Sequence, residues 1–259
     1  MKITVFTSNQ PRHISLTKRL ASISEELYCV QECNTVFPGQ IDDFYKKSDV
    51  MQKYFSNVIN AEGRLFGKVS FSSKNVRTLS IKNGDLNKLE RDALEFALYS
   101  DIYVVFGASY IKGWLIDFLV SKDAINIHMG LSPYYRGASC NFWALYDGNP
   151  SYVGGTIHKL SKGLDSGPIL YHCVPTYDGE DSFLFTMKSV DVAQKSLVDR
   201  ISSKEIFDMA PTPQDKSLEM RYARNSSFTS EVAREFLNRS LDLKDFHFEY
   251  PNLLKPYFG

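Results

Sequence analysis

The sequence has little of what marks several protein classes. Only four of its 259 residues are cysteines, too few and too scattered for a disulfide framework. Basic and acidic residues number 30 each, and the zero net charge argues against binding nucleic acid through surplus positive charge. No apolar run approaches the roughly 18 residues that a membrane span requires, and the first residues lack a signal-peptide pattern. We therefore expect a cytoplasmic protein without nucleic-acid or membrane partners.

Several common catalytic motifs are missing as well. There is no phosphate-binding loop of the Gly-x-x-x-x-Gly-Lys type, and the turn at residues 7–11 has no glycine for a dinucleotide fingerprint. The sequence contains neither His-Glu-x-x-His nor the Gly-x-Ser-x-Gly nucleophile turn. His158 and His172 do not have a recognised metal-ligand spacing, so we interpret both as histidines packed within strands. We expect no metal.

The apolar pattern predicts alternating strands and helices. Strands are expected at residues 2–7, 27–30, 76–81, 101–107, 124–128, 152–159 and 168–175, and helices at 14–23, 86–98, 112–121 and 183–201. The nearly all-apolar run at 101–107 is typical of a strand covered on both faces, as in a parallel sheet. The last two strands are close in sequence, which favours an antiparallel or mixed extension. The prediction is an α/β fold, Rossmann-like, with a mostly parallel sheet flanked by helices.

Composition changes divide the chain into a main domain and a short extension. Residues 1–210 are expected to form the main domain, with a polar and aromatic helical excursion at about 36–71. Residues 211–259 carry seven basic and seven acidic residues and are expected to form a small C-terminal appendage. The aromatic content of 14% and the excursion indicate an exposed apolar surface that would pair two chains as a homodimer.

Two segments combine turn residues with side chains suited to catalysis. Residues 125–137 read Ile-Asn-Ile-His-Met-Gly-Leu-Ser-Pro-Tyr-Tyr-Arg-Gly. Asn126 and His128 share one face of an extended strand, at the edge where open α/β sheets bind ligands. Asp165 lies in a glycine-flanked loop between two expected strands. Taken singly, the first pair also fits a buried cap of the strand end, and Asp165 fits a turn aspartate that bonds its own backbone.

Together these segments resemble the folate-dependent formyltransferases. The resemblance rests on Asn-x-His, the following Leu-Ser-Pro-Tyr-Tyr-Arg-Gly loop, and Asp-x-Gly-x-Ile 37 positions after the histidine. It covers roughly residues 75–175 well and the first strand–helix unit weakly. The family includes glycinamide ribonucleotide transformylase, methionyl-tRNA formyltransferase and the sugar N-formyltransferases. The resemblance implies 10-formyltetrahydrofolate as cosubstrate and residues 1–210 as the catalytic domain.

The resemblance also implies roles for individual residues. Asn126, His128 and Asp165 would be catalytic. Asn126 and protonated His128 would donate hydrogen bonds to the negative oxygen of a tetrahedral intermediate, while Asp165 would favour the imidazolium and help to move a proton. The residues implied to line the pterin pocket are Gly107, Ser109, Tyr110 and Ile111 on one side, and Leu160, Gly163 and Leu164 on the other.

The short, charge-balanced tail bears on the acceptor. Methionyl-tRNA formyltransferases carry a basic C-terminal domain, so the chain is most similar to the sugar N-formyltransferases, which implies a nucleotide-linked amino sugar of surface polysaccharide synthesis as acceptor. The alternatives are a hydrolase that releases formate from the same donor, a formyltransferase acting on another small amine, and a folate-binding module without catalysis.

Four further residues are candidates for binding the acceptor, each with a plainer alternative. Ser8 and Asn9 are expected at a helix N-terminus, where they would either bind an anion or cap the helix. Arg136 would either hold an anionic part of the acceptor or pin its own loop. Tyr222 would either touch the acceptor or lie at the surface.

Overall fold

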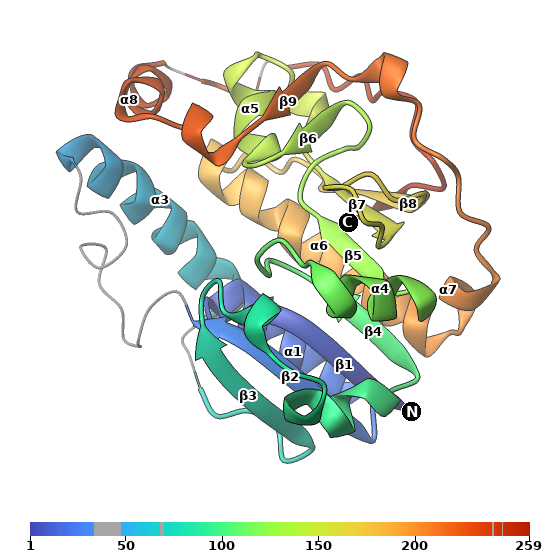
Figure 1. Ribbon diagram of the computed structural model, residues 1–259. Helices are drawn as coiled ribbons and strands as arrows, with labels where there is room; N and C mark the ends of the chain where they lie inside the picture. Colours follow the sequence, from blue (N-terminus) through green and yellow to red (C-terminus); the bar gives the residue numbers. More distant parts are fainter. Residues whose placement is uncertain (34–47, 68–69, 240, 245) are drawn as a thin grey trace.

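The computed structural model describes residues 1–33, 48–67, 70–239, 241–244 and 246–259, and its centre is a mixed sheet between two layers of helices (Figure 1). The sheet contains, in chain order, β1 (Lys2–Ser8), β2 (Glu26–Cys33), β3 (Val76–Lys82), β4 (Ile102–Val105), β5 (Ile125–His128), β7 (Gly155–Lys159), β8 (Ile169–Val174) and β10 (Tyr257–Phe258). Their order in space is β10-β8-β7-β5-β4-β1-β2-β3. Strand β7 runs antiparallel to β5 and β8, and the other pairs are parallel. The predicted fold class is confirmed.

Helices cover both faces of the sheet. They are α1 (Pro11–Ser22), α3 (Asp49–Phe66), α4 (Gly113–Ser121), α5 (Cys140–Tyr146), α6 (Ser182–Ser202), α7 (Glu205–Asp208) and α8 (Ser230–Asn238), with 3₁₀ turns at Leu86–Lys88, Asp92–Tyr99, Pro150–Tyr152, Lys216–Leu218 and Asn225–Ser227. Apolar residues of α1 and α6 pack on one face of the sheet, and those of α4 and the first two 3₁₀ turns on the other. Strand order and helix layers together bring the carboxyl ends of β4 and β5 to one edge.

The predicted helix at 86–98 is wrong. Two separate 3₁₀ helices occupy this stretch, because Leu89 between them adopts an extended conformation with ψ 133°. The indole Nε1 of Trp114 donates to the Leu89 carbonyl at 3.0 Å, so this carbonyl is bonded to α4 instead of to a following helical turn. The apolar spacing placed the correct side chains inward but could not reveal this break.

The predicted excursion at 36–71 contains one long helix. Ser48 caps α3, with its hydroxyl accepting the Met51 N–H at 3.3 Å. Residues 36–47 and 68–69 of the predicted excursion lie outside the described residues. Aromatic contacts tie α3 to its neighbours: the Tyr54 ring lies 5.2 Å from that of Phe183 on α6 and 6.2 Å from that of Phe236 on α8, centre to centre. Helix α3 therefore forms one wall beside the carboxyl edge of the sheet.

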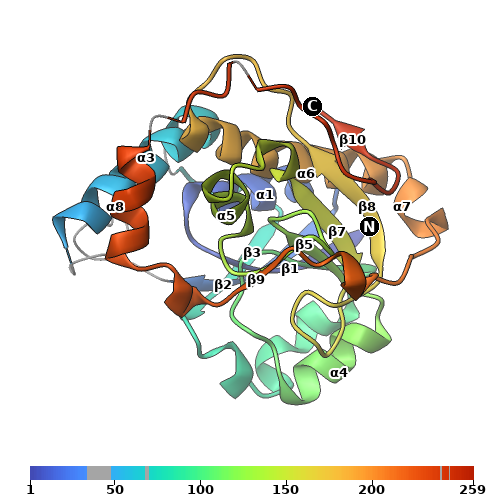
Figure 2. The same cartoon turned by 90° about the horizontal axis from the view of Figure 1, so that it is seen from above.

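The segment after residue 210 contacts the rest of the fold at several places (Figure 2). Strand β9 (Arg221–Ala223) pairs in parallel with β6 (Tyr135–Gly137), and β10 adds a strand beside β8. Helix α8 lies beside α3 in both views. The division into domains at residue 210 stays a prediction, as do the cytoplasmic setting and the homodimer. Among the described residues, no helix combines the length and apolarity needed to cross a membrane.

Candidate active site

A cavity of about 470 Å³ opens where β4 and β5 end. Its walls come from the start of α1, α3, the residues after β4, the end of β5, the end of β6, the start of α5, the loop after β7, the first half of α6 and Phe228. Asn126, His128 and Asp165 all line it. The two predicted segments, separated in sequence, are therefore brought to one cavity.

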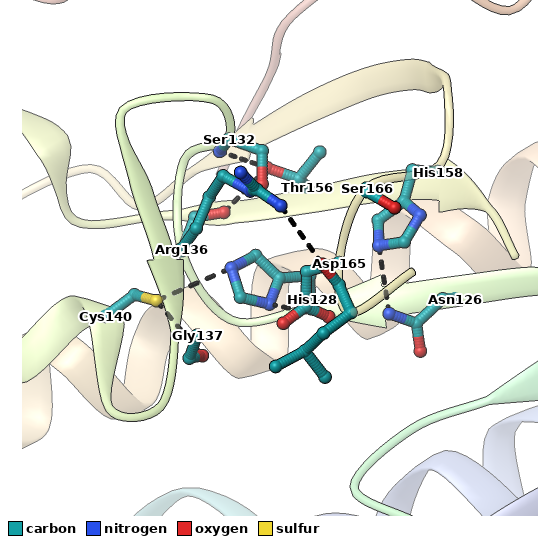
Figure 3. Close-up of polar contacts among 12 residues, drawn as sticks. Asn126, His128, Ser132, Arg136, Gly137, Cys140, Thr156, His158, Asp165 and Ser166 are labelled. Carbon is teal, nitrogen blue, oxygen red and sulfur yellow. Dashed lines mark hydrogen bonds and ion pairs between the residues drawn. The ribbon is translucent and has the colours of Figure 1, made fainter. Parts of the chain in front are cut away.

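His128 and Asp165 form a buried pair (Figure 3). Nδ1 of His128 lies 3.4 Å from Oδ1 of Asp165, and the two side chains are only 6% and 15% exposed. Burial alone would lower the pKa of His128, but the Asp165 carboxylate, together with Cys140, raises it well above its usual range. Burial would raise the pKa of Asp165, and the His128 charge outweighs this and lowers it. Both shifts favour an imidazolium–carboxylate pair at neutral pH.

The loop that carries Asp165 is held from three sides. Asp165 itself has a left-handed backbone, with φ +45°. Nε2 of Gln214 donates to the carbonyls of Asp165 and Gly167, each at 2.8 Å, and Arg136 donates to the Leu164 carbonyl at 3.1 Å. A Cβ on Gly167 would lie 1.7 Å from the Lys159 carbonyl oxygen, so this turn needs glycine to fold back onto β7.

Asn126 is oriented by a histidine on the neighbouring strand. Residues Asn126 and His158 are directly opposite in the β5–β7 pair, and Asn126 Nδ2 lies 3.0 Å from His158 Nε2. Burial lowers the pKa of His158 to about 4, so the ring is neutral at pH 7. Its Nδ1 lies 2.8 Å from the Lys159 carbonyl, an oxygen that only accepts, which makes Nε2 the acceptor of the Asn126 amide. One amide hydrogen is thereby used, and the other is left to donate.

A smaller cavity of about 100 Å³ adjoins the first and shares Asn126, Leu164 and Asp165 with it. Six of the seven residues implied for the pterin pocket line it: Ser109, Tyr110, Ile111, Leu160, Gly163 and Leu164; the seventh, Gly107, lines the larger cavity. The Glu32 carboxylate accepts the N–H and the hydroxyl of Ser109, at 2.6 and 2.8 Å, and fixes one side of this space. Two facing loops with apolar walls fit a flat heterocycle.

The four predicted acceptor-binding residues lie elsewhere. Ser8 ends β1 and its hydroxyl donates to the Glu32 carbonyl at 3.0 Å, while Gln10, not Ser8 or Asn9, occupies the N-cap position of α1. Arg136 pairs with Glu219 at 2.8 Å, in addition to its bond to Leu164. Its guanidinium lies 5.9 Å from the Tyr222 ring, which is 46% exposed on β9. None of the four is among the residues that line the two described cavities, and Arg136 fits the pinning alternative.

Sequence reasoning overlooked several residues at this site. His158 was interpreted as a packed strand histidine; it is buried in β7 as expected, but it also bonds Asn126. The position of His158 opposite Asn126 in an antiparallel strand pair could have identified it as a residue of this site. Cys140 beside His128 and Glu32 beneath Ser109 depend on long-range contacts, so no local pattern marks them. His172 is a packing residue as predicted, bonded to the Ser132 carbonyl at 2.7 Å.

No metal site accompanies these groups in the part of the chain that the structure describes: there, no three His, Cys, Asp or Glu residues are grouped to hold an ion. The larger cavity brings three functional side chains together. They are one amide donor, one charged imidazole and one carboxylate around a common space. Such an arrangement can stabilise negative charge on an oxygen and move a proton.

Known proteins share part of this sequence. Residues 98–201 match the family model described as formyl transferase. Formyltetrahydrofolate deformylase 2 of Arabidopsis thaliana is 32% identical over 126 residues, covering 46% of this chain and 36% of that protein. Methionyl-tRNA formyltransferase of Trichodesmium erythraeum is 27% identical over 186 residues, covering 69% of this chain and 51% of that protein. The chain thus spans about half or less of the length of these relatives.

Solved structures share the fold at lower sequence identity. A sugar N-formyltransferase from Shewanella is 17% identical with a TM-score of 0.53, covering 88% of this chain and 78% of that chain. The formyltransferase PseJ from Anoxybacillus kamchatkensis, solved with a formamido UDP-sugar and tetrahydrofolate, is 16% identical with a TM-score of 0.52, and each chain is covered to 93%. The resemblance predicted from the sequence is confirmed over residues 98–201, and these solved structures share the fold over most of the chain.

Proposed function

Since this chain resembles the folate-dependent formyltransferases and residues 98–201 match their family model, we propose that it moves a formyl group from 10-formyltetrahydrofolate to a primary amine. The observation that carries the proposal is the shared cavity of Asn126, His128 and Asp165, with His128 and Asp165 paired at 3.4 Å. An amide, an imidazolium and a carboxylate are the groups that this transfer requires.

The smaller cavity is proposed to receive the pterin end of the folate. The residues proposed to hold the pterin are those on its two facing loops, with Ser109 and Ile111 on one side and Leu160 and Leu164 on the other. Main-chain groups of such loops can bond a heterocycle that carries donors and acceptors on its edge. When bound, 10-formyltetrahydrofolate supplies the one-carbon unit. Asn126 and Asp165 line both cavities. They therefore lie between the smaller cavity, proposed for the folate, and the larger cavity, proposed for the acceptor.

Asn126 and His128 are proposed to stabilise the charge that develops on the formyl oxygen. His158 accepts one hydrogen of the Asn126 amide. The orientation of the amide is therefore fixed, and its second hydrogen can donate to the formyl oxygen. His128 is charged through its pairing with Asp165 and donates a charge-assisted hydrogen bond. Donors held in place before the reaction are worth about 100- to 1,000-fold in rate each.

Asp165 is proposed to move the proton. An attacking amine must lose a proton as its bond to carbon forms, and the departing folate nitrogen must gain one. Asp165 lies beside His128 and borders both cavities. Its carboxylate can accept the amine proton, directly or through water. The ion pair with His128 keeps this carboxylate in place during the transfer.

We propose an amino sugar, nucleotide-linked, as the acceptor. Two observations support this: several proteins that share the fold are sugar N-formyltransferases, and one was solved with a UDP-linked formamido sugar. The larger cavity is lined by the aromatic residues Tyr54, Phe142 and Phe228 and by Arg12, whose guanidinium pairs with Glu62 at 3.0 Å. Apolar ring faces and a nearby charge suit a sugar that has both apolar and polar faces.

A second candidate is hydrolysis of the same donor. It is favoured by the matches to two mitochondrial formyltetrahydrofolate deformylases of Arabidopsis thaliana, at 32% and 33% identity over 126 and 124 residues. The same three side chains could activate water in place of an amine. The two functions differ in whether the formyl group ends on an amine or in formate.

The test incubates the protein with 10-formyltetrahydrofolate and a panel of free and nucleotide-linked amino sugars. Mass spectrometry records the N-formyl product, and a formate assay records hydrolysis. We expect an N-formyl sugar from one panel member and slow formate release without acceptor. Fast formate release that no amine suppresses would establish the hydrolase instead. Folate binding with neither product would contradict both functions.

A further inference from the structure

Cys140 contacts His128 on the side opposite to Asp165. Its Sγ lies 3.5 Å from His128 Nε2 and 3.4 Å from the Gly137 carbonyl oxygen, to which the thiol donates. The residue begins α5, is 2% exposed and lines the larger cavity. Figure 3 shows the imidazole between the thiol and the carboxylate. His128 thus has a polar partner at each ring nitrogen.

Gly130 allows the thiol to come this close. A Cβ at residue 130 would lie 2.4 Å from Cys140 Cβ and 2.9 Å from His128 Nε2, shorter than side chains tolerate. Any larger residue would push the thiol and the imidazole apart. The contact is therefore a consequence of the loop that follows β5, not of a freely rotating side chain.

We propose that Cys140 is a positioning residue for His128, its sulfur accepting the Nε2–H of the protonated imidazole. The role rests on the formyl transfer proposed above. The thiol has one proton, which it donates to Gly137, so its lone pairs are left for Nε2. The Tyr135 carbonyl, 3.3 Å from Nε2, can only accept, and Asp165 accepts at Nδ1. With an acceptor at every contact, both nitrogens carry hydrogen.

The charged and titratable groups around the ring agree with this assignment. Burial opposes the charge on His128, while Asp165 and Cys140 favour it and hold the pKa well above its usual range. The His158 ring is 6.4 Å away, centre to centre, and is neutral because burial lowers its pKa to about 4. The positive charge of Arg136 contributes to lowering the pKa of both Asp165 and His158.

Two long bonds at Nε2 suit a group that must change partners. Bonds of 3.3 and 3.5 Å keep the ring in place before substrate arrives, yet they are weaker than a short bond to a developing oxyanion. Cys140 would therefore fix the ring orientation without competing with the reacting oxygen. A residue acting through His128 in this way should alter the ionisation of His128 and the rate, and leave folate binding unchanged.

The test is an NMR titration of His128 in the parent protein, Cys140→Val and Cys140→Ser. His128→Gln identifies the resonance among the five histidines. Valine removes the acceptor and adds about one methyl group, whereas serine keeps an acceptor. We expect the His128 midpoint to fall by about half a pH unit or more in Cys140→Val, roughly threefold in the protonation equilibrium, and by less in Cys140→Ser. Cys33→Ser, a thiol on β2 outside the lining of the larger cavity, should leave it unchanged.

The pH dependence of kcat should shift in the same direction as the His128 midpoint. In Cys140→Val, the alkaline limb of kcat should move to lower pH with the KM for folate within about twofold of the parent, and Cys140→Ser should restore it in part. The titration needs no turnover, so a protein that transfers no formyl group but shows the shift would contradict the proposed function and retain the positioning role. Equal midpoints in all three proteins would overturn the role.

A formyl adduct on the Cys140 peptide after incubation with 10-formyltetrahydrofolate would also overturn it, because the sulfur would then act as a nucleophile. Should Cys140→Val not fold, Cys140→Ala removes the acceptor without adding volume, and the same shift is expected. Circular dichroism of each variant confirms that the fold is retained before titration.

Discussion

The amide of Asn126 donates a hydrogen bond to the neutral imidazole of His158, with 3.0 Å between Nδ2 and Nε2. The two residues face each other across β5 and β7, the pair of strands that run antiparallel. An amide that we propose to be catalytic, and that could otherwise rotate, is thereby held with one hydrogen directed at a fixed acceptor. Replacing His158 should therefore affect the chemistry of Asn126.

His158→Ala should lower kcat about tenfold or more with little change in KM, because the Asn126 amide loses its fixed orientation. His158→Gln should retain more of the activity, since its side-chain oxygen can accept from Asn126. Steady-state kinetics of the two variants measures the difference. Equal losses in both variants would show that the bond to Asn126 is not what matters.

Asp165→Asn should move the alkaline limb of kcat to lower pH by about 1 to 3 units. The carboxylate raises the pKa of His128, so its loss lets the imidazolium deprotonate earlier as pH rises. A pH–rate profile of the residual formyl transfer records the shift, at a lower overall rate because Asp165 is also proposed to move the proton. Asp178→Asn, whose carboxylate pairs with Lys188 away from the cavity, is the control and should reproduce the parent profile. An unmoved limb in Asp165→Asn would contradict the pairing.

Gly167→Ala should destabilise the protein by about 1 to 3 kcal/mol and reduce activity. The added Cβ would lie 1.7 Å from the Lys159 carbonyl, so the loop that carries Asp165 must move. Urea unfolding measures the free energy. Gly63→Ala is the matched control: nothing lies within 4 Å of its added Cβ on α3, and the better helix former should leave stability unchanged or raise it slightly. Similar losses in both would argue against the loop contact.

Acid should weaken the fold partly through His158. Its pKa is lowered to about 4 in the folded protein and returns to about 6.5 when unfolded. Between these values the unfolded chain binds more protons, so stability falls as pH falls. The contribution of His158 to this loss is about 2 to 3 kcal/mol between pH 7 and 4. His158→Gln should lose less stability over the same range in urea titrations, and an identical loss would show that another group is responsible.

Local patterns predicted the strands and long helices because each of them buries an apolar stripe. Strand 101–107 and helix 183–201 were expected within a few residues of β4 and α6. The helix at 86–98 failed, since the bond between Trp114 and the Leu89 carbonyl is a long-range contact that propensity does not encode. The place of β10 beside β8 likewise depends on the tail returning to the sheet.

At the site, too, local patterns predicted some features, whereas long-range contacts determined the others. The shared strand face singled out Asn126 and His128 as a pair. The resemblance to a family then gave these two residues and Asp165 their proposed roles. Their convergence on one cavity, and the contacts of Cys140 and Glu32, depend on how the loops fold back. Ser8 was expected at the start of a helix, but its backbone continues β1 as far as residue 8, so its hydroxyl bonds β2 instead.

The most direct test of the account is a crystal structure with a stable folate analogue that carries a one-carbon group. We predict the pterin between residues 107–111 and 160–164, with the one-carbon oxygen within about 3 Å of both Asn126 Nδ2 and a ring nitrogen of His128. An analogue bound away from these residues, or bound there with its one-carbon group turned from Asn126 and His128, would contradict the assignment.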